Sequence, residues 1–215
     1  MPALPPRPRN RLPRGVARAV MTLIAVLALT GCGNSETPKS TPSPAPTPIG
    51  QLNTDAMTLA RVDFCALLPD PAVRKALGGG LGDQVSWRNG ERAQIDTDTR
   101  DVAHEYGCAW TRAQYAASAW IYARPITSEF AKAVLAKTSR RNGCTPHAGP
   151  DFGSPHRQQN CRLPDGTKRV RLAGLFKDTY LTCQVQAPGK ENDKALAERA
   201  DEWCVQVANA TNIAR

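Results

Sequence analysis

The sequence of 215 residues lacks an apolar segment that could cross a membrane as a stable helix. Its main apolar run, AVMTLIAVLALT from Ala19 to Thr30, would span roughly 18 Å as a helix, against roughly 30 Å for a hydrocarbon core. Aromatic residues are also few, with four Trp, four Tyr and four Phe scattered along the chain. This scarcity argues against the stacking platforms that bind single-stranded nucleic acid.

Sequence motifs of common enzyme classes are missing as well. There is no GxSxG, and no serine is followed three residues later by lysine, which removes the usual serine-hydrolase and penicillin-binding signatures. HEYGC at His104 lacks the second histidine of a zinc protease, and GGGLG at Gly78 lacks the lysine of a phosphate loop. We therefore expect no metal and no cofactor, and favour a binding domain. The alternative is an envelope enzyme that acts on cell-wall or lipid material with an unrecognised site.

Charge is unevenly distributed between the start of the chain and the rest. Residues 1–31 contain five arginines and no acidic residue, so removing this segment takes the formal charge from +9 to +4. A charge of +4 is a weak signal for nucleic-acid binding. We predict no nucleic-acid partner.

Residues 1–31 have the three parts of an export signal, which are an arginine-bearing start, an apolar segment and a small residue before a cut. Leu29, Thr30, Gly31 and Cys32 resemble the bacterial lipobox. That resemblance implies cleavage after Gly31 and fatty acylation of Cys32, with chains such as palmitate. Two or three acyl chains hold a protein to a bilayer far better than one. The expected location is the cell membrane, with a lipid anchor on the extracytoplasmic side.

Composition divides the remaining chain in two. Residues 32–53 are rich in Ser, Thr and Pro without apolar periodicity, as is typical of a disordered tether. The eighteen residues GNSETPKSTPSPAPTPIG within it could reach about 55 Å. Residues 54–215 are long enough for one domain with its own core.

The pattern of residues 54–215 predicts an α+β fold. A short helix is signalled by Asp70 and Pro71 at its start and Gly78 at its end. Two units follow, each a hairpin and then a helix, which favours one antiparallel sheet with helices on one face. The segments are hairpin strands at 104–112 and 116–124, a helix at 127–140, strands at 168–176 and 179–187, and a helix at about 192–209.

Six cysteines remain once Cys32 is set aside, an even number in an exported chain, which favours three disulfides. Fifteen connectivities are possible for six cysteines. The predicted elements favour a disulfide between Cys183 and Cys204, which would join a strand to the last helix. They also favour Cys144 with Cys161 across a loop, which leaves Cys65 for Cys108.

A zinc site competes with this interpretation. Cys144, His147, His156 and Cys161 supply two thiolates and two imidazoles within eighteen residues, donors that zinc accepts. The nearby prolines and the export signal count against it, and free-thiol titration separates the two possibilities.

Basic residues gather between Lys137 and Arg171, a segment with eight basic and two acidic residues. Such a patch could contact phospholipid head groups or an anionic envelope polymer, or be a solvated surface without a partner. The candidate patch consists of Arg140, Arg141, Arg157, Arg162, Lys168, Arg169 and Arg171.

Over about residues 60–208, the chain resembles an uncharacterised family of actinobacterial lipoproteins. The resemblance rests on the segments DFCALLPDPAVRKALG, GCAW, YLTCQV and RADEWC. It implies a small disulfide-held α+β domain and no particular activity. The expected partners are the membrane through the lipid and a small ligand, a lipid or an envelope protein.

Overall fold

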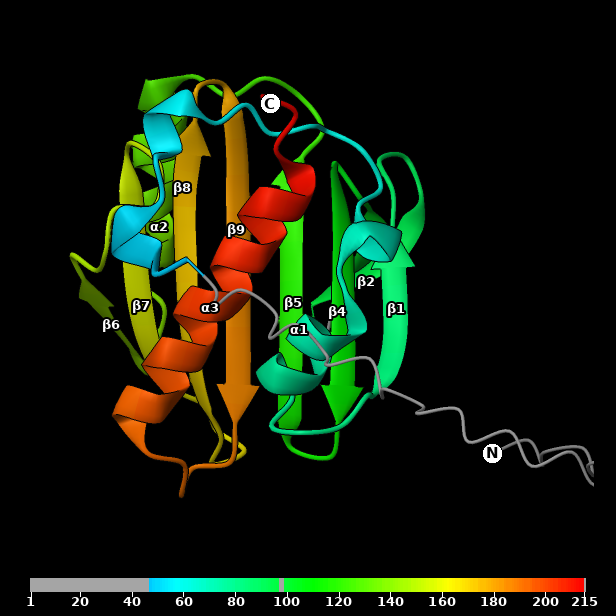
Figure 1. The fold of residues 1–215 in the computed structure, drawn as a ribbon, viewed down its shortest axis with the longest axis vertical. Coiled ribbons are helices and arrows are strands. Elements are labelled where there is room, and N and C mark those ends of the chain that lie inside the picture. The colour runs from blue at the N-terminus through cyan, green and yellow to red at the C-terminus, as the bar shows by residue number, and fades with distance from the viewer. Residues whose placement is uncertain (1–46, 97–98, 215) are drawn as a thin grey trace, which may run out of the picture. The chain divides into compact units, whose positions relative to one another are not determined.

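The computed structural model describes residues 47–96 and 99–214. The predicted leader, with Leu29, Thr30, Gly31 and Cys32, lies outside the described residues, as does most of the predicted tether. The described chain is built on a seven-stranded antiparallel sheet (Figure 1). In spatial order its strands are β1 (Asp83–Trp87), β4 (Glu105–Arg112), β5 (Tyr115–Tyr122), β9 (Thr179–Ala187), β8 (Lys168–Phe176), β7 (His156–Arg162) and β6 (Cys144–His147).

Three α-helices pack on this sheet, α1 (Asp70–Ala76), α2 (Ser128–Thr138) and α3 (Asp193–Thr211). A separate hairpin of β2 (Arg92–Asp96) and β3 (Thr99–Val102) precedes β4. Short 3-10 turns lie before α1, at Ile49–Gln51, Thr54–Ala56 and Cys65–Leu67. Within the described residues, no helix is both long and apolar enough to span a bilayer.

The last helix forms where the sequence predicts it, because Asn192 accepts hydrogen bonds from the backbone N–H groups of Lys194 and Ala195. Its apolar stripe, which includes Trp203, is buried against the sheet. Trp203 donates its indole N–H to the carbonyl of Ser118 at 3.1 Å, and its ring meets Trp110 edge-on at 5.5 Å between centroids. The helix is thereby fixed across the middle of the sheet.

Both predicted hairpins, β4 with β5 and β8 with β9, are present, and the α+β prediction with an antiparallel sheet is confirmed. Alternation along β4 places Cys108 and Trp110 in the core under α3, as the sequence indicates. On β8 the same alternation sends Val170 and Leu172 toward α3 and Arg171 to the opposite face.

The placement of the helices corrects the prediction that all of them lie on one face. Helix α2 packs through Ala131 and Leu135 on Ala173, Leu175 and Tyr180. These strand residues alternate with the ones that contact α3, so α2 lies on the other face, behind β8 and β7 in Figure 1. On this helix Ala131 is buried against the sheet, whereas Phe130 is 51% exposed.

The segment between Cys144 and Cys161, predicted to be an irregular loop, contains the strands β6 and β7. The reason is that β7 is an almost wholly polar strand, HRQQNCR, in which only Gln159 and Cys161 are buried. Polar strands near a sheet edge do not show the apolar alternation by which a strand is recognised.

The folded region begins a few residues before the predicted boundary at residue 54. Ile49 is 8% exposed and packs in the core beneath α3, and Leu52 packs against the same cluster. A single isoleucine within a proline and threonine run does not stand out by composition, although burial of its side chain fixes the chain there.

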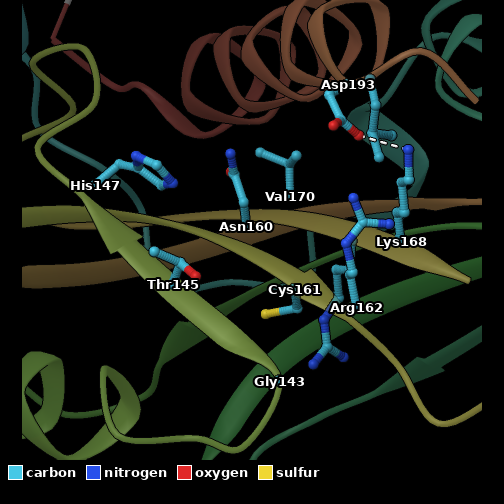
Figure 2. Close-up of a pocket in the computed structure, with 11 residues that line it drawn as sticks. Gly143, Thr145, His147, Asn160, Cys161, Arg162, Lys168, Val170 and Asp193 are labelled. Atoms are coloured by element: carbon cyan, nitrogen blue, oxygen red, sulfur yellow. Dashed lines mark hydrogen bonds and ion pairs between the residues drawn. The ribbon is translucent and has the colours of Figure 1, made fainter.

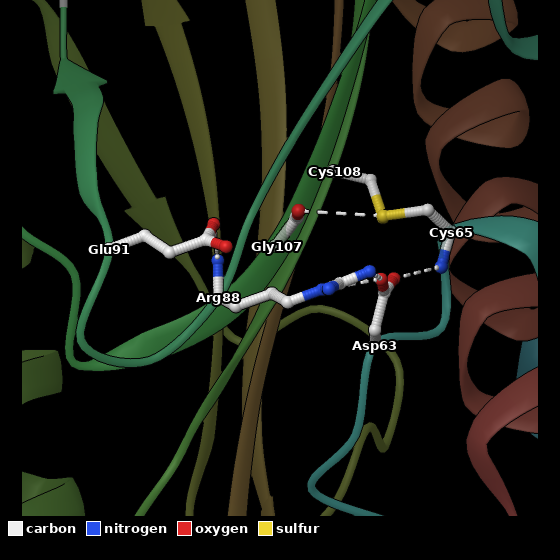
Figure 3. Close-up of a disulfide and its surroundings, with 6 residues drawn as sticks. All are labelled: Asp63, Cys65, Arg88, Glu91, Gly107 and Cys108. Carbon is white, nitrogen blue, oxygen red and sulfur yellow. Dashed lines mark hydrogen bonds and ion pairs between the residues drawn. A yellow bond between two sulfur atoms is a disulfide. The ribbon is translucent and has the colours of Figure 1, made fainter.

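Three disulfides join the pairs that the strand pattern favoured. They are Cys65–Cys108, Cys144–Cys161 and Cys183–Cys204, with Cα atoms 5.7, 4.0 and 5.6 Å apart. Figure 3 shows the first of these between the chain before α1 and β4. Two of the three therefore tie covering elements to central strands, and the third joins the edge strand β6 to its neighbour β7.

Candidate functional site

The face of the sheet opposite α1 and α3, here called the open face, contains a groove of about 570 Å³ beside α2. Alternate residues of five strands form its floor, and the C-terminal part of α2 and the residue Arg141 form one side. The residues that line this open-face groove are Val85, Trp87, Glu105, Ala109, Thr111, Ala116, Ser118, Trp120, Tyr122, Val134, Thr138, Arg141, Arg169, Arg171, Ala173, Tyr180, Thr182 and Gln184.

Small side chains produce the hollow. Val85, Ala109 and Ser118 are register partners in a row across β1, β4 and β5, and the row continues through Gln184 to Arg171 on β8. Because alanine and serine project little above a sheet, the floor between β1 and β9 stays low. Helix α2 covers only the other end of this face, over Ala173, Leu175 and Tyr180.

The β1 side of the groove depends on Gly107. A Cβ atom added at Gly107 would clash with ring atoms of Trp87, so the indole lies directly against the backbone of β4. In this position Trp87 donates its indole N–H to Glu105 Oε1 at 3.1 Å. Burial raises the pKa of Glu105, and the hydrogen bond from Trp87 and the charge of Arg171 oppose that rise.

Arg171 differs from the other residues of the groove because it is a nearly buried cation. Its side chain is 8% exposed, and its guanidinium carbon lies 4.7 Å from the ring centroid of Trp120. Stacking of this kind holds the planar guanidinium in place while its N–H groups stay at the ring edge. Within residues 47–96 and 99–214, the guanidinium group has this ring contact but no hydrogen bond or ion pair.

The electrostatics around Arg171 are unfavourable to a buried cation. Burial lowers its pKa to about 10, and the positive charges of Arg141 and Arg169 lower it further. Glu105 is near enough for Arg171 to affect its pKa, but the two side chains form no ion pair. A buried cation in such surroundings needs an anionic or hydrogen-bonding partner. The described residues do not supply one.

Two tyrosines complete the end of the groove near α2. The rings of Tyr122 and Tyr180 lie 5.5 Å apart between centroids, and burial raises the pKa of both hydroxyls. Both hydroxyls are therefore neutral at physiological pH and able to donate hydrogen bonds.

The basic patch expected from the sequence is not one continuous surface. Arg141, Arg169 and Arg171 line the open-face groove, whereas Arg140 and Arg157 are exposed and lie outside it. The aromatic residues and Glu105 of this groove could not be recognised from the sequence, since nothing in the composition relates them to the arginines. The alternation of KRVRLAGLF, which puts Arg169 and Arg171 on one face, was the available signal.

A second, smaller pocket of about 340 Å³ lies between β6, β7 and the start of α3 (Figure 2). Arg162 and Lys168 line it with His147 and Asp193. Lys168 donates to Asp193 Oδ1 at 2.6 Å and to the carbonyl of Glu191 at 2.9 Å, so its charge is already neutralised within the fold. This pocket is therefore a weaker candidate for a ligand.

Cysteine-based metal sites do not form while the disulfides are intact. Cys144 and Cys161 are bonded to each other, so the pair proposed as zinc ligands has no thiolate to offer. A second grouping, Asp63 with Cys65 and Cys108, also contains two bonded sulfurs. Its carboxylate is held by Arg88, whose hydrogen bonds lower the pKa of Asp63 (Figure 3).

Comparison with known proteins adds little to this geometry. No protein-family model and no curated protein matches the chain. Among solved structures, the chain is similar to the extracellular domain of PknH from Mycobacterium tuberculosis, with 12% identity and a TM-score of 0.41. The match covers 71% of this chain and 96% of that domain. The function therefore has to be inferred from the geometry of the groove.

Proposed function

We propose that the chain is an extracytoplasmic lipoprotein whose folded domain binds an anionic ligand in the open-face groove. The observation that carries the binding proposal is Arg171, a nearly buried guanidinium that stacks on Trp120 and has no acceptor among the described residues. Burying an unpaired charge costs several kcal/mol in general, and an anion that enters the groove would offset that cost.

Binding fits the surroundings of Arg171 better than a structural role does. A purely structural cation is usually hydrogen-bonded to a carboxylate or to carbonyl groups. Lys168 shows that arrangement in this same molecule, with Asp193 and the Glu191 carbonyl as its acceptors. Arg171 instead lines the open-face groove, with no hydrogen-bond acceptor among the described residues.

The location outside the cytoplasm is supported by the export signal and by three disulfides. The lipid anchor on Cys32 and membership in the actinobacterial lipoprotein family are predictions from the sequence. A clickable palmitate analogue tests the anchor. Wild-type protein should become labelled and sediment with membranes, whereas the C32A variant should do neither. Equal labelling of C32A would overturn the assignment of the attachment site.

The groove is tested with 1-naphthalenesulfonate, a small aromatic anion, titrated calorimetrically into the full mature chain. We expect Arg171→Met to weaken binding at least tenfold. The matched control is Arg157→Met, which removes an exposed arginine outside the groove and should change affinity less than twofold. Thermal unfolding of each variant verifies that it is folded. Undiminished binding to folded Arg171→Met would refute the proposed site.

A further inference from the structure

We propose that the open-face groove is built for a phosphate monoester carried on an apolar group, rather than for a carboxylate. This inference rests on the proposed function and adds the chemical class of the ligand. Its grounds are the charge facing the groove, the geometry of the arginines and the apolar floor that leads away from them.

The charges that face the groove favour an anion of more than one negative charge. Arg141 and Arg171 bring two positive charges to its lining, and Glu105, the single carboxylate among the lining residues, accepts a hydrogen bond from Trp87. A carboxylate has one negative charge, while a phosphate monoester has about 1.5 to 2 near pH 7. The phosphate therefore matches the charge of these two arginines more closely.

The arrangement of the arginines suits an oxyanion with three terminal oxygens. Arg169 and Arg171 are two residues apart on β8 and project from the same face of the sheet. Arg141 follows the end of α2, so Arg141 and Arg171 reach the groove from two different elements. Guanidinium groups bind phosphate oxygens in pairs, and a tetrahedral phosphate can accept from more than one arginine at once.

The rest of the groove suits an apolar group attached to that phosphate. From Arg171 the row of register partners crosses β9, β5 and β4 to Val85 on β1, a path of about 19 Å at the usual strand spacing. Ala109 and Ser118 keep this path low, and Trp87 bounds it at the β1 side. Glu105 beside Trp87 disfavours a second anionic group at that end.

The experiment compares three probes with one ring system, 1-naphthyl phosphate, 1-naphthoate and 1-naphthol, with inorganic phosphate as a fourth. Each is titrated into the full mature chain at pH 7.5. We expect 1-naphthyl phosphate to bind at least tenfold more tightly than 1-naphthoate, and both 1-naphthol and inorganic phosphate to bind more weakly still. Arg171→Met should abolish the preference for phosphate, and Arg141→Met, which changes an exposed residue, should reduce it about threefold.

The outcomes separate this inference from the proposed function. If 1-naphthoate binds as tightly as 1-naphthyl phosphate and Arg171→Met weakens both, the phosphate preference is wrong while the anion site stands. If no anionic probe depends on Arg171, both proposals fall.

A final competition distinguishes the source of the phosphate. Dihexanoyl phosphatidic acid, used below its micelle concentration, should displace bound 1-naphthyl phosphate if a lipid head group can enter the groove, with dihexanoyl phosphatidylcholine as the control. Displacement by phosphatidic acid alone supports a lipid phosphate. A lack of displacement, with tight binding of the naphthyl ester, supports a soluble phosphate ester.

Discussion

The two faces of the sheet are made from the same strands and have opposite character. On the face under α1 and α3, the strands contribute a continuous apolar core that includes two disulfides and the Trp110–Trp203 pair. On the open face, the intervening residues include Arg171, Trp120 and Glu105 around a hollow. Because side chains alternate along a strand, stability and binding are assigned to alternate residues of one segment. Changes on the two faces should therefore have different consequences.

The largest expected effect comes from a pair of tryptophans, one on each face. Trp203→Ala removes a 1% exposed ring, its hydrogen bond to Ser118 and its contact with Trp110, so it should cost about 3 to 5 kcal/mol of unfolding free energy. Trp120→Ala on the open face should cost about 1 kcal/mol and weaken binding of naphthyl probes instead. Urea unfolding with parallel titrations measures both, and equal stability losses would contradict the division between faces.

The disulfides allow a second comparison, between the centre of the covered face and the edge of the sheet. Replacing Cys183 and Cys204 by alanine opens a closed loop and leaves space between β9 and α3, so we expect a loss of about 3 to 5 kcal/mol. The same change at Cys144 and Cys161, near the sheet edge, should cost about 3 kcal/mol or less, with naphthyl phosphate affinity retained. Calorimetric unfolding of both double variants shows whether removing the central disulfide lowers the unfolding free energy more than removing the one near the edge.

A smaller effect is expected from a carboxylate on the covering helix. Burial, followed by the charges of Glu198 and Glu202, raises the pKa of Asp201 to about 6. The ionised group therefore destabilises the folded state above that pH, and the penalty disappears as pH falls below about 4, where both states are protonated. Asp201→Asn should stabilise the protein by about 1 kcal/mol at pH 7.5, allowing for solvent screening, and by almost nothing at pH 3.5. Glu198→Gln serves as the control and should give a smaller gain. A pH-independent gain would show that ionisation is not the cause.

The smallest predicted effect lies in the groove and concerns Glu105. Its pKa is raised by burial, so its negative charge is lost at a higher pH than usual, and an anion near Arg171 would then be repelled less. Affinity for 1-naphthalenesulfonate, whose own charge does not change, should rise about two- to fivefold as pH falls from 7.5 to 5. Glu105→Gln keeps an oxygen for Trp87 and should bind more tightly at pH 7.5 with little pH dependence. A pH profile identical to that of wild type would exclude Glu105 as its origin.

Much of the core could be predicted from local pattern. The spacing of Leu196 and Trp203 along α3 and the alternation around Cys108 on β4 indicate the buried sides of these elements. The Cys183–Cys204 pair follows from such buried faces, whereas Cys144–Cys161 was expected across a loop that the structure shows as two strands, and Cys65–Cys108 was the remaining pair. Apolar periodicity specifies which side of an element is buried, and it accounts for one of the three pairs directly.

The groove could not be predicted, because it depends on contacts between strands distant in sequence. Trp120, whose ring contacts Arg171, comes from another hairpin, and Arg141, whose charge lowers the pKa of Arg171, comes from beyond α2. The side on which α2 packs likewise depends on its contacts with Ala173, Leu175 and Tyr180, which come later in the sequence than the helix. An arginine in a basic segment therefore suggested a solvated surface, whereas the fold buries it.

The edge strand β6 has a consequence for how copies of this domain meet. Arg162 donates its backbone N–H to the carbonyl of Gly143, so by antiparallel alternation the nitrogen of Pro146 faces away from β7. Proline has no N–H, and that exposed position cannot offer a donor to the strand of another molecule. The Cys144–Cys161 bond also fixes β6 to its neighbour. This edge of the sheet therefore offers few donors for pairing with a strand of another molecule, which disfavours extension of the sheet by self-association.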